Sequence, residues 1–316
     1  MRQQEISALV AAIRAQPWAI LPEYLEAIEA IAVRALDSDI LKLLAEDGHK
    51  ESMDASRMAV ASVGTRLEGS RGSTIRNGNA VIPLLGTVFP RSSMVNASTG
   101  GTSLDSLMHD IRVAQASADV ERIVMVIDSP GGVVSSLGEA ADTIRGSNKP
   151  IVGFVAGMGA SAAYWLASQA SELVLDRSAS VGSIGVVATT SRQEAPGTDG
   201  RRSYEVVSSG APMKRPDLST EEGRASVQAE VDAIEAVFIA DVAAGRRVDE
   251  ARVRTDFGRG SMISAARAVT AGMADRIGTL ESMLSTPSRR TGPNGAGRRA
   301  LATAQIETRR RAAQGV

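Results

Sequence analysis

The sequence predicts an α/β protein with a buried, largely parallel sheet, preceded by a helical N-terminal region and followed by a basic tail. Three observations lead to this prediction. From residue 80 onward, short apolar runs alternate with helix-length segments, as in strands joined by crossover helices. One of these runs, Arg122–Asp128, is nearly continuous in β-branched residues, as expected of a central strand. Residues 287–316 carry seven arginines and one glutamate but little that could be buried.

We expect three parts. Residues 1–72 comprise a helical region, in which Leu21, Leu25 and Ile28 recur at helical spacing, and a polar linker rich in Ser, Gly and Arg. Residues 73–286 form the α/β domain, and residues 287–316 form a disordered tail.

Strands of the α/β domain are expected over residues 80–88, 122–128, 150–156, 172–176, 180–187 and 204–207. The helices between them are expected from residue 104, over residues 134–145, after residue 161, over residues 219–244 and up to residue 271. Thr102 or Ser103 would cap the first helix, and Gly272 would end the last one. Ser219 and Glu222 have the spacing of a capping box for the long helix. Residues 190–202 are predicted to be a loop.

Composition excludes several kinds of function. The net charge of −1 argues against a nucleic-acid-binding core, and the absence of cysteine excludes disulfides, thiolate nucleophiles and thiolate metal sites. With only His49 and His109, a histidine-rich metal centre is not expected, and we expect no cofactor. No run of about 18 uncharged apolar residues occurs, so we expect a cytosolic protein without a membrane span.

A candidate nucleophile lies in residues 153–170, where a strand, a Gly-rich turn and a helix follow one another. Ser161 lies at the start of the helix, among glycines and alanines that leave room for a ligand beside the backbone. Unpaired amides at the start of a helix favour a negatively charged oxygen there. The alternative is that Ser161 only caps the helix.

Lys214 is the best candidate for the base that would activate Ser161. No histidine follows Ser161, and His109 falls on an amphipathic helix, so a Ser-His-Asp triad has little support. The chain has 31 arginines but only four lysines, and Lys214 alone follows Ser161. A lysine that is stripped of water can lose its proton near neutral pH, whereas an arginine cannot. Lys149, at the start of the 150–156 strand, should lie at the opposite edge from Ser161.

The glycines of the DSPGG segment supply candidate oxyanion-binding groups. Gly131 and Gly132 follow the expected central strand, so their amides can point at a developing negative charge, together with the amide of Ala162. The same pattern is also common in plain turns.

Four segments in this order resemble one known family: DSPGG, AGMGASAAYWLASQA, SVGSIGVV and YEVVSSGAPMK, the last followed by STEEG and a long helix. The chain is similar over residues 80–284 to the signal peptide peptidase A family of Ser/Lys proteases, and in outline to its bacteriophage head-maturation (prohead, or capsid assembly) branch. The resemblance implies a Clp/crotonase-like α/β fold and assembly into homo-oligomeric rings.

It also implies roles for individual residues. Ser161 would be the nucleophile, Lys214 the general base, and Ser183 the residue that orients the lysine. The oxyanion hole would consist of Gly131, Gly132 and the amide after the nucleophile, which belongs to Ala162. Three departures stand out: alanines in ASAAY where glycines are frequent, Asp128 where asparagine is common, and one additional residue before Lys214.

The implied function is a serine endopeptidase that processes phage or prophage head or scaffold proteins in the host cytoplasm or the prohead. Three alternatives remain open. The chain could be a housekeeping protease of the signal-peptide-peptidase type, although those usually carry a membrane anchor. It could instead be a crotonase-like acyl-CoA enzyme or an inactive scaffold protein for head assembly.

Overall fold

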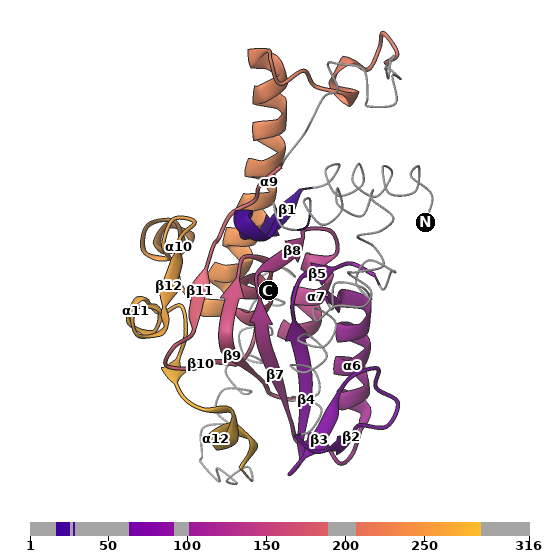
Figure 1. The fold of residues 1–316 in the computed structure, drawn as a ribbon, viewed down its shortest axis with the longest axis vertical. Coiled ribbons are helices and arrows are strands. Elements are labelled where there is room, and N and C mark those ends of the chain that lie inside the picture. The colour runs from indigo at the N-terminus through magenta and orange to yellow at the C-terminus, as the bar shows by residue number, and fades with distance from the viewer. Residues whose placement is uncertain (1–16, 26–27, 29–62, 92–100, 189–206, 286–316) are drawn as a thin grey trace, which may run out of the picture.

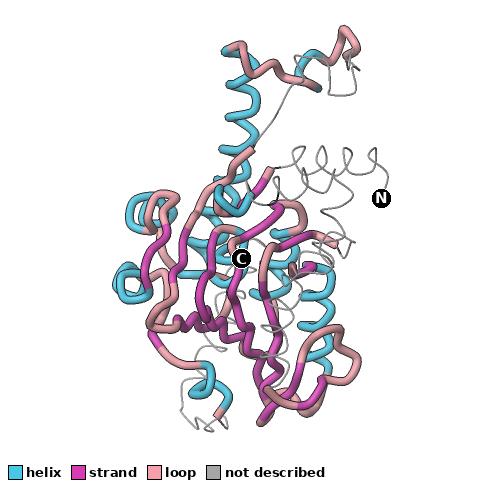
Figure 2. Tube along the Cα trace, viewed as in Figure 1, coloured by secondary structure: helices cyan, strands magenta, loops and turns pink. Residues whose placement is uncertain are grey.

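The computed structural model describes residues 17–25, 28, 63–91, 101–188 and 207–285. They form a mixed α/β fold in which one face of a sheet is packed against a row of helices and a long helix projects beyond the body (Figure 1, Figure 2). The predicted tail, the whole 190–202 loop and His49 lie outside the described residues.

The larger sheet has the strand order β12-β11-β9-β7-β4-β3-β2, with β10 and β13 joined at the side of β9. Its strands are β2 (Thr65–Arg66), β3 (Thr74–Arg76), β4 (Asn79–Leu85), β7 (Arg122–Ser129), β9 (Ile151–Ala160), β10 (Glu172–Leu175), β11 (Ser180–Gly182), β12 (Met262–Ser264) and β13 (Arg276–Ile277). Strands β4, β7, β9, β10 and β11 pair in parallel, which confirms the parallel core predicted from the apolar runs.

Strand β9 is longer than its sequence predicts. The glycines after residue 156 suggested a turn, but the strand continues through Gly157 and Gly159 to Ala160. Its first half pairs with β10 and its second half with β11, so neighbouring backbone keeps the Gly-rich half extended. Ser161 therefore follows directly from the end of a central strand.

A smaller sheet has the order β1-β8-β5-β6 and lies beside the carboxyl end of β7 (Figure 1). Its strands are β1 (Trp18–Ile20), β5 (Val88–Phe89), β6 (Thr102–Ser103) and β8 (Gly131–Val133). Residues 18–20, expected within a helical region, are thus a strand, and the described helical residues there start at Pro22. The helical prediction failed at these residues because β1 depends on pairing with β8, more than a hundred residues away in the chain.

The helices are α6 (Leu104–Ala116), α7 (Leu137–Arg145), α8 (Ala162–Ala167), α9 (Glu221–Arg246), α10 (Glu250–Asp256), α11 (Ala265–Ala271) and α12 (Leu280–Leu284), with a 3-10 turn η1 (Pro212–Lys214). Ser103 caps α6 by accepting from the Ser106 amide, and Gly272 ends α11 with a φ of 88°, both as predicted. The predicted capping box of α9 is wrong: Thr220 is the cap and accepts from the Gly223 amide, while Ser219 bonds to Asp217.

Alternate residues of the central strands fill two cores. On one face, Ile82, Met125 and Ile127 pack with the row α6-α7-α8-α9. On the other face, Val124 and Val126 pack with residues of α12. Because α8 is enclosed by this row, all six of its residues are buried. Among the described helices, none is both long and apolar enough to cross a membrane.

Candidate active site

Ser161 lies at the junction between β9 and α8, as predicted. Its amide donates to the Gly182 carbonyl at 2.8 Å, and its Oγ donates to the Gly185 carbonyl at 3.4 Å. The side chain makes no hydrogen bond to the first turn of α8, so it does not act as a helix cap. This geometry removes the structural alternative for Ser161 and leaves its hydroxyl directed at the segment after β11.

The backbone of Ser161 is strained. Its φ of 50° and ψ of −116° lie in a region that residues with a side chain rarely adopt. Such a conformation costs about 1–3 kcal/mol and persists only where the surroundings impose it, most often at functional sites. Here pairing of β9 with β11 fixes the residue on one side, and the buried helix α8 fixes it on the other.

Gly131 and Gly132 lie close to Ser161, also as predicted. Gly131 has a φ of 105°, and a Cβ at that position would lie 3.1 Å from the carbonyl oxygen of Ala160. The Gly131 amide donates to Ser129 Oγ at 3.2 Å. A Cβ on Gly132 would meet the Val88 carbonyl at 2.0 Å, so both positions require glycine. Ala162 is fully buried in the first turn of α8, where amides have no acceptor within the helix.

Ser183 lies beside Ser161. Gly182 is paired with Ala160, so each serine follows directly from one of two neighbouring parallel strands, which are about 5 Å apart. Ser183 also has a positive φ, of 52°, and is nearly buried. The structure therefore brings together Ser161, Ser183, the two glycines and Ala162.

Lys214 is not part of this group. It is exposed in η1, and the segment that carries η1 lies beyond the projecting N-terminal end of α9, well away from the end of β9 (Figure 1). The single chain thus presents the predicted nucleophile and the predicted base as separate groups.

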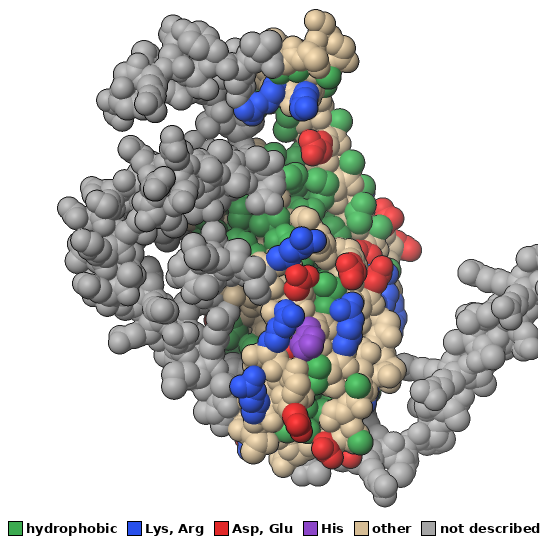
Figure 3. Space-filling view, turned by 90° about the vertical axis from the view of Figure 1, so that its right-hand side faces the viewer, with side chains coloured by type: hydrophobic (Ala, Val, Ile, Leu, Met, Phe, Trp, Pro, Cys, Tyr) green, Lys and Arg blue, Asp and Glu red, His purple; other side chains and the backbone are tan. Residues whose placement is uncertain are grey.

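The other described lysine and histidine have structural partners. Lys149 Nζ donates to the carbonyls of Ala114 and Ser117 at the C-terminal end of α6. Because β9 separates it from Ser161 by ten residues, the two lie about 30 Å apart. His109 contacts the Gly69 carbonyl at 2.9 Å, and Figure 3 shows a histidine on the surface among charged side chains. Neither residue can act on Ser161.

A polar network lies next to α8. Arg246 binds Asp275 through two hydrogen bonds of 2.9 and 3.0 Å, and Asp275 also accepts from the Leu173 amide. Burial opposes the ionisation of Asp275, but the hydrogen bonds from Arg246 and Leu173 outweigh it and lower the pKa of this carboxyl. Burial raises the pKa of Tyr164, whose hydroxyl donates to the Met273 carbonyl. These groups hold α8 in place and do no chemistry at Ser161.

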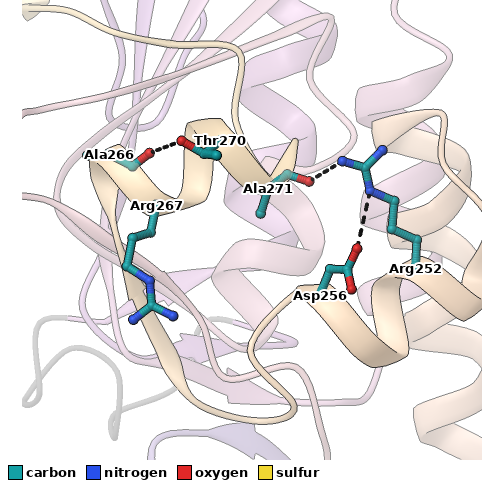
Figure 4. Close-up of a pocket in the computed structure, with 6 residues that line it drawn as sticks. All are labelled: Arg252, Asp256, Ala266, Arg267, Thr270 and Ala271. Carbon is teal, nitrogen blue, oxygen red and sulfur yellow. Dashed lines mark hydrogen bonds and ion pairs between the residues drawn. The ribbon is translucent and has the colours of Figure 1, made fainter.

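Two hollows lie near α10. The first, of about 450 Å³, lies between α10 and α11 and contains none of the predicted site residues (Figure 4). The second, of about 480 Å³, includes Gly185, the partner of the Ser161 hydroxyl, together with Asp232 and Glu235 of α9. Of these two hollows, only the second is lined by a residue that contacts Ser161.

Two features of the site were not predicted. One is the Gly185 carbonyl, which no side-chain pattern could reveal. The other is Asp128, whose carboxylate accepts from the Met158 amide at 3.0 Å at the irregularity between β7 and β9. The aspartate in DSPGG therefore shapes the Gly-rich half of β9.

Comparison with known proteins supports the prediction made from the motifs. Residues 143–289 match the model of Peptidase family S49, and residues 90–178 match that of Clp protease. The mixed α/β architecture and the second match fit the predicted Clp/crotonase-like fold.

Three curated proteins are similar to the chain. Capsid assembly protease C of Escherichia phage lambda is 29% identical over 171 residues, which cover 54% of this chain and 34% of that protein. Head-tail preconnector protein GP5 of Enterobacteria phage P21 is 33% identical over 113 residues, 35% of this chain and 23% of that protein. Protease 4 of Salmonella typhi is 29% identical over 107 residues, 32% of this chain and 17% of that protein.

The chain thus spans about a third or less of the length of the relatives that it matches. The resemblance predicted from the motifs is nevertheless confirmed: residues 143–289 match peptidase family S49, and the similar proteins include a capsid assembly protease.

Proposed function

We propose that the chain is a serine endopeptidase in which Ser161 is the nucleophile. The observation that carries this proposal is the placement of Ser161 on a strained strand-to-helix turn beside Gly131, Gly132 and the Ala162 amide. A nucleophile and a set of fixed backbone donors around one point are what acyl transfer requires.

In this mechanism Ser161 Oγ attacks a peptide carbonyl, and Lys214, in its neutral form, takes the hydroxyl proton. The amides of Gly131, Gly132 and Ala162 bind the tetrahedral oxyanion. Lys214 then gives the proton to the leaving amine, and water hydrolyses the acyl-enzyme. Ser183, adjacent to Ser161, orients the amine of Lys214.

Lys214 must reach Ser161 for this mechanism to operate. Because the segment that carries Lys214 lies beyond the end of α9, we propose that Lys214 contacts Ser161 in an assembled ring, where a neighbouring copy supplies the lysine.

The proposed substrates are head or scaffold proteins of a phage or prophage, processed in the host cytoplasm or in the prohead. This follows from the relative named as a capsid assembly protease. Residues 1–72 and 287–316 are proposed as appendages of a protease domain spanning residues 73–286.

The first prediction concerns the base. Lys214→Arg should reduce peptide hydrolysis by at least about a hundredfold, because the charge remains but no base is left. Lys149→Arg is the matched control and should keep full activity, since an arginine can still donate to the carbonyls at the end of α6. Turnover of a quenched fluorescent peptide measures both variants, with Ser161→Ala as the blank. Full activity in Lys214→Arg would assign the base to another residue.

An inactive scaffold protein is the second candidate. The exposure of Lys214 in the single chain favours this candidate, because a serine without a neighbouring base does not hydrolyse peptides. Hydrolysis that disappears in Ser161→Ala would exclude this candidate.

A further inference from the structure

Strand β1 lies where a polypeptide beside Ser161 would have to bind. Ile20 pairs with Gly131 and Ala19 with Gly132, the two residues proposed to bind the oxyanion. A Cβ on Gly131 would lie 3.0 Å from Ile20 Cα and 3.1 Å from the Ala160 carbonyl oxygen, so Ile20 is close to the residue that precedes Ser161. Ser161 itself is 0% exposed.

Strand β1 is bound along both of its edges. On one side it pairs antiparallel with β8, with a further hydrogen bond from the Leu21 amide to the Pro130 carbonyl at 3.1 Å. On the other side Trp18 and Val187 exchange two hydrogen bonds of 2.9 Å each. Val187 lies two residues beyond Gly185, the partner of the Ser161 hydroxyl. A short strand inserted between two strand edges is how an extended peptide binds a protein.

A substrate and β1 cannot occupy this groove together. The opposite edge of β8 is taken by β5, since Val88 pairs with Gly132. An extended chain next to the Gly131 amide can therefore use only the edge that β1 already fills.

The side chains of β1 also fill the groove. Trp18 and Ile20 pack with Phe89 and Val133, and the Trp18 and Phe89 rings meet edge to face with centroids 6.4 Å apart. Ala19 points the other way into the main core and is fully buried. The groove thus accepts large apolar residues at alternate positions with a small residue between them.

The strand ends in a way that avoids cleavage. The Leu21 carbonyl accepts from the amides of Tyr24 and Leu25, at 3.0 and 3.2 Å. It is therefore used by the helical turn and is not offered to the amides of Gly131 and Ala162. Pro22 follows directly and is the first residue of that helical turn.

We propose that residues 18–21 are an internal inhibitor of the protease, which must leave the groove before a substrate segment of the pattern large–small–large enters it. The inference rests on the proposed function for the identity of the groove. It predicts that the intact chain binds substrate peptides weakly, because apparent affinity falls with the fraction of molecules in which the groove is open.

The test measures binding separately from hydrolysis. The probe is a fluorescein-labelled peptide with the sequence of residues 14–21, RAQPWAIL, added to full-length chains that carry Ser161→Ala. Ala19→Arg places a charge in the core and should expel β1, so that anisotropy shows at least tenfold tighter binding. Glu23→Arg adds a positive residue in the same segment at an exposed position and should leave the affinity unchanged. The control peptide carries Asp in place of tryptophan and should not bind.

A second variant locks the strand reversibly. The chain has no cysteine, and Trp18 and Val187 are a hydrogen-bonded antiparallel pair, with Cα atoms about 5.5 Å apart, within reach of a disulfide. The Trp18→Cys/Val187→Cys variant should bind the peptide when reduced and at least tenfold more weakly when oxidised, whereas Val187→Cys alone should not respond to oxidation. This variant decides the question if Ala19→Arg fails to fold.

The outcomes separate the two proposals. Equal affinity in Ala19→Arg and Glu23→Arg, or in the reduced and oxidised double variant, would overturn the inhibitory role. With Ser161 restored, equal hydrolysis by the intact chain and Ala19→Arg would also overturn it while supporting the protease. Tighter binding in Ala19→Arg without any hydrolysis would instead overturn the protease and leave the inhibitory strand in place.

Discussion

At the scale of single residues, the conformation of Ser161 differs from that of a serine that caps a helix. An N-cap serine has an extended backbone, as Ser103 does with a φ of −88°, and its side chain accepts from the first turn of the helix. Ser161 has neither property. The sequence predicted the position of Ser161 from the small residues around it but could not predict the strain, which arises from the pairing of Gly182 with Ala160.

The strained backbone at position 161 predicts how the stabilities of two variants compare, one with glycine and one with alanine at this position. Ser161→Gly should unfold with a free energy equal to or above that of Ser161→Ala, because glycine adopts a positive φ without the cost of about 1–3 kcal/mol. Ala163→Gly, in the buried helix that follows, is the control and should lose about 1 kcal/mol relative to the unmodified chain. Chemical denaturation measures all three. A Ser161→Gly chain that is about 1 kcal/mol less stable than Ser161→Ala would argue against strain.

At the scale of elements, the position of α8 depends on close packing against α9. A Cβ on Gly245 would lie 2.3 Å from the carbonyl oxygen of Ser168, at the C-terminal end of α8. Helix α9 therefore touches the backbone of the helix that begins after Ser161. Trp165 adds to this contact by stacking on Phe238, with ring centroids 4.5 Å apart, and by donating to Asp241.

This contact predicts opposite effects for two substitutions in helices. Gly245→Ala should lower the stability by about 1–3 kcal/mol and reduce activity, because the added methyl group meets backbone that cannot rotate away. Gly138→Ala in α7, where no atom lies within 4 Å of the new methyl group, should raise the stability by up to about 1 kcal/mol. Thermal unfolding of both variants provides the comparison. A neutral Gly245→Ala would show that α8 and α9 are not held this closely.

Elements made by local pattern were predicted well, and elements made by distant pairing were not. The apolar run of β7 and the glycine stop of α11 are local signals, and both were found. Strand β1 and the second half of β9 contain residues that read as helix and turn, and only their partners β8 and β11 make them strands. For the same reason the motifs predicted which residues surround Ser161, whereas no local pattern predicts where Lys214 lies in the fold.

At the scale of the whole molecule, we propose that the dyad combines residues from two copies of the chain. The body carries Ser161, and the projecting end of α9 leads to the segment that carries Lys214 (Figure 1). Two inactive chains should then restore activity when they are mixed. Ser161→Ala and Lys214→Arg, assembled together, should recover up to about a quarter of the unmixed wild-type rate if copies combine at random, since each intact pair needs one residue from each. No recovery would place both residues of the dyad in the same copy.

Chemical labelling of Ser161 tests the central claim most directly. The unmodified chain and the Ala19→Arg chain would be treated with a fluorophosphonate, and the modified residue would be located by mass spectrometry of peptides. We predict a single adduct on Ser161, formed faster in the Ala19→Arg chain and absent from chains that also carry Ser161→Ala. Adducts on other serines alone, or no adduct in either chain, would contradict the assignment of Ser161 as a nucleophile.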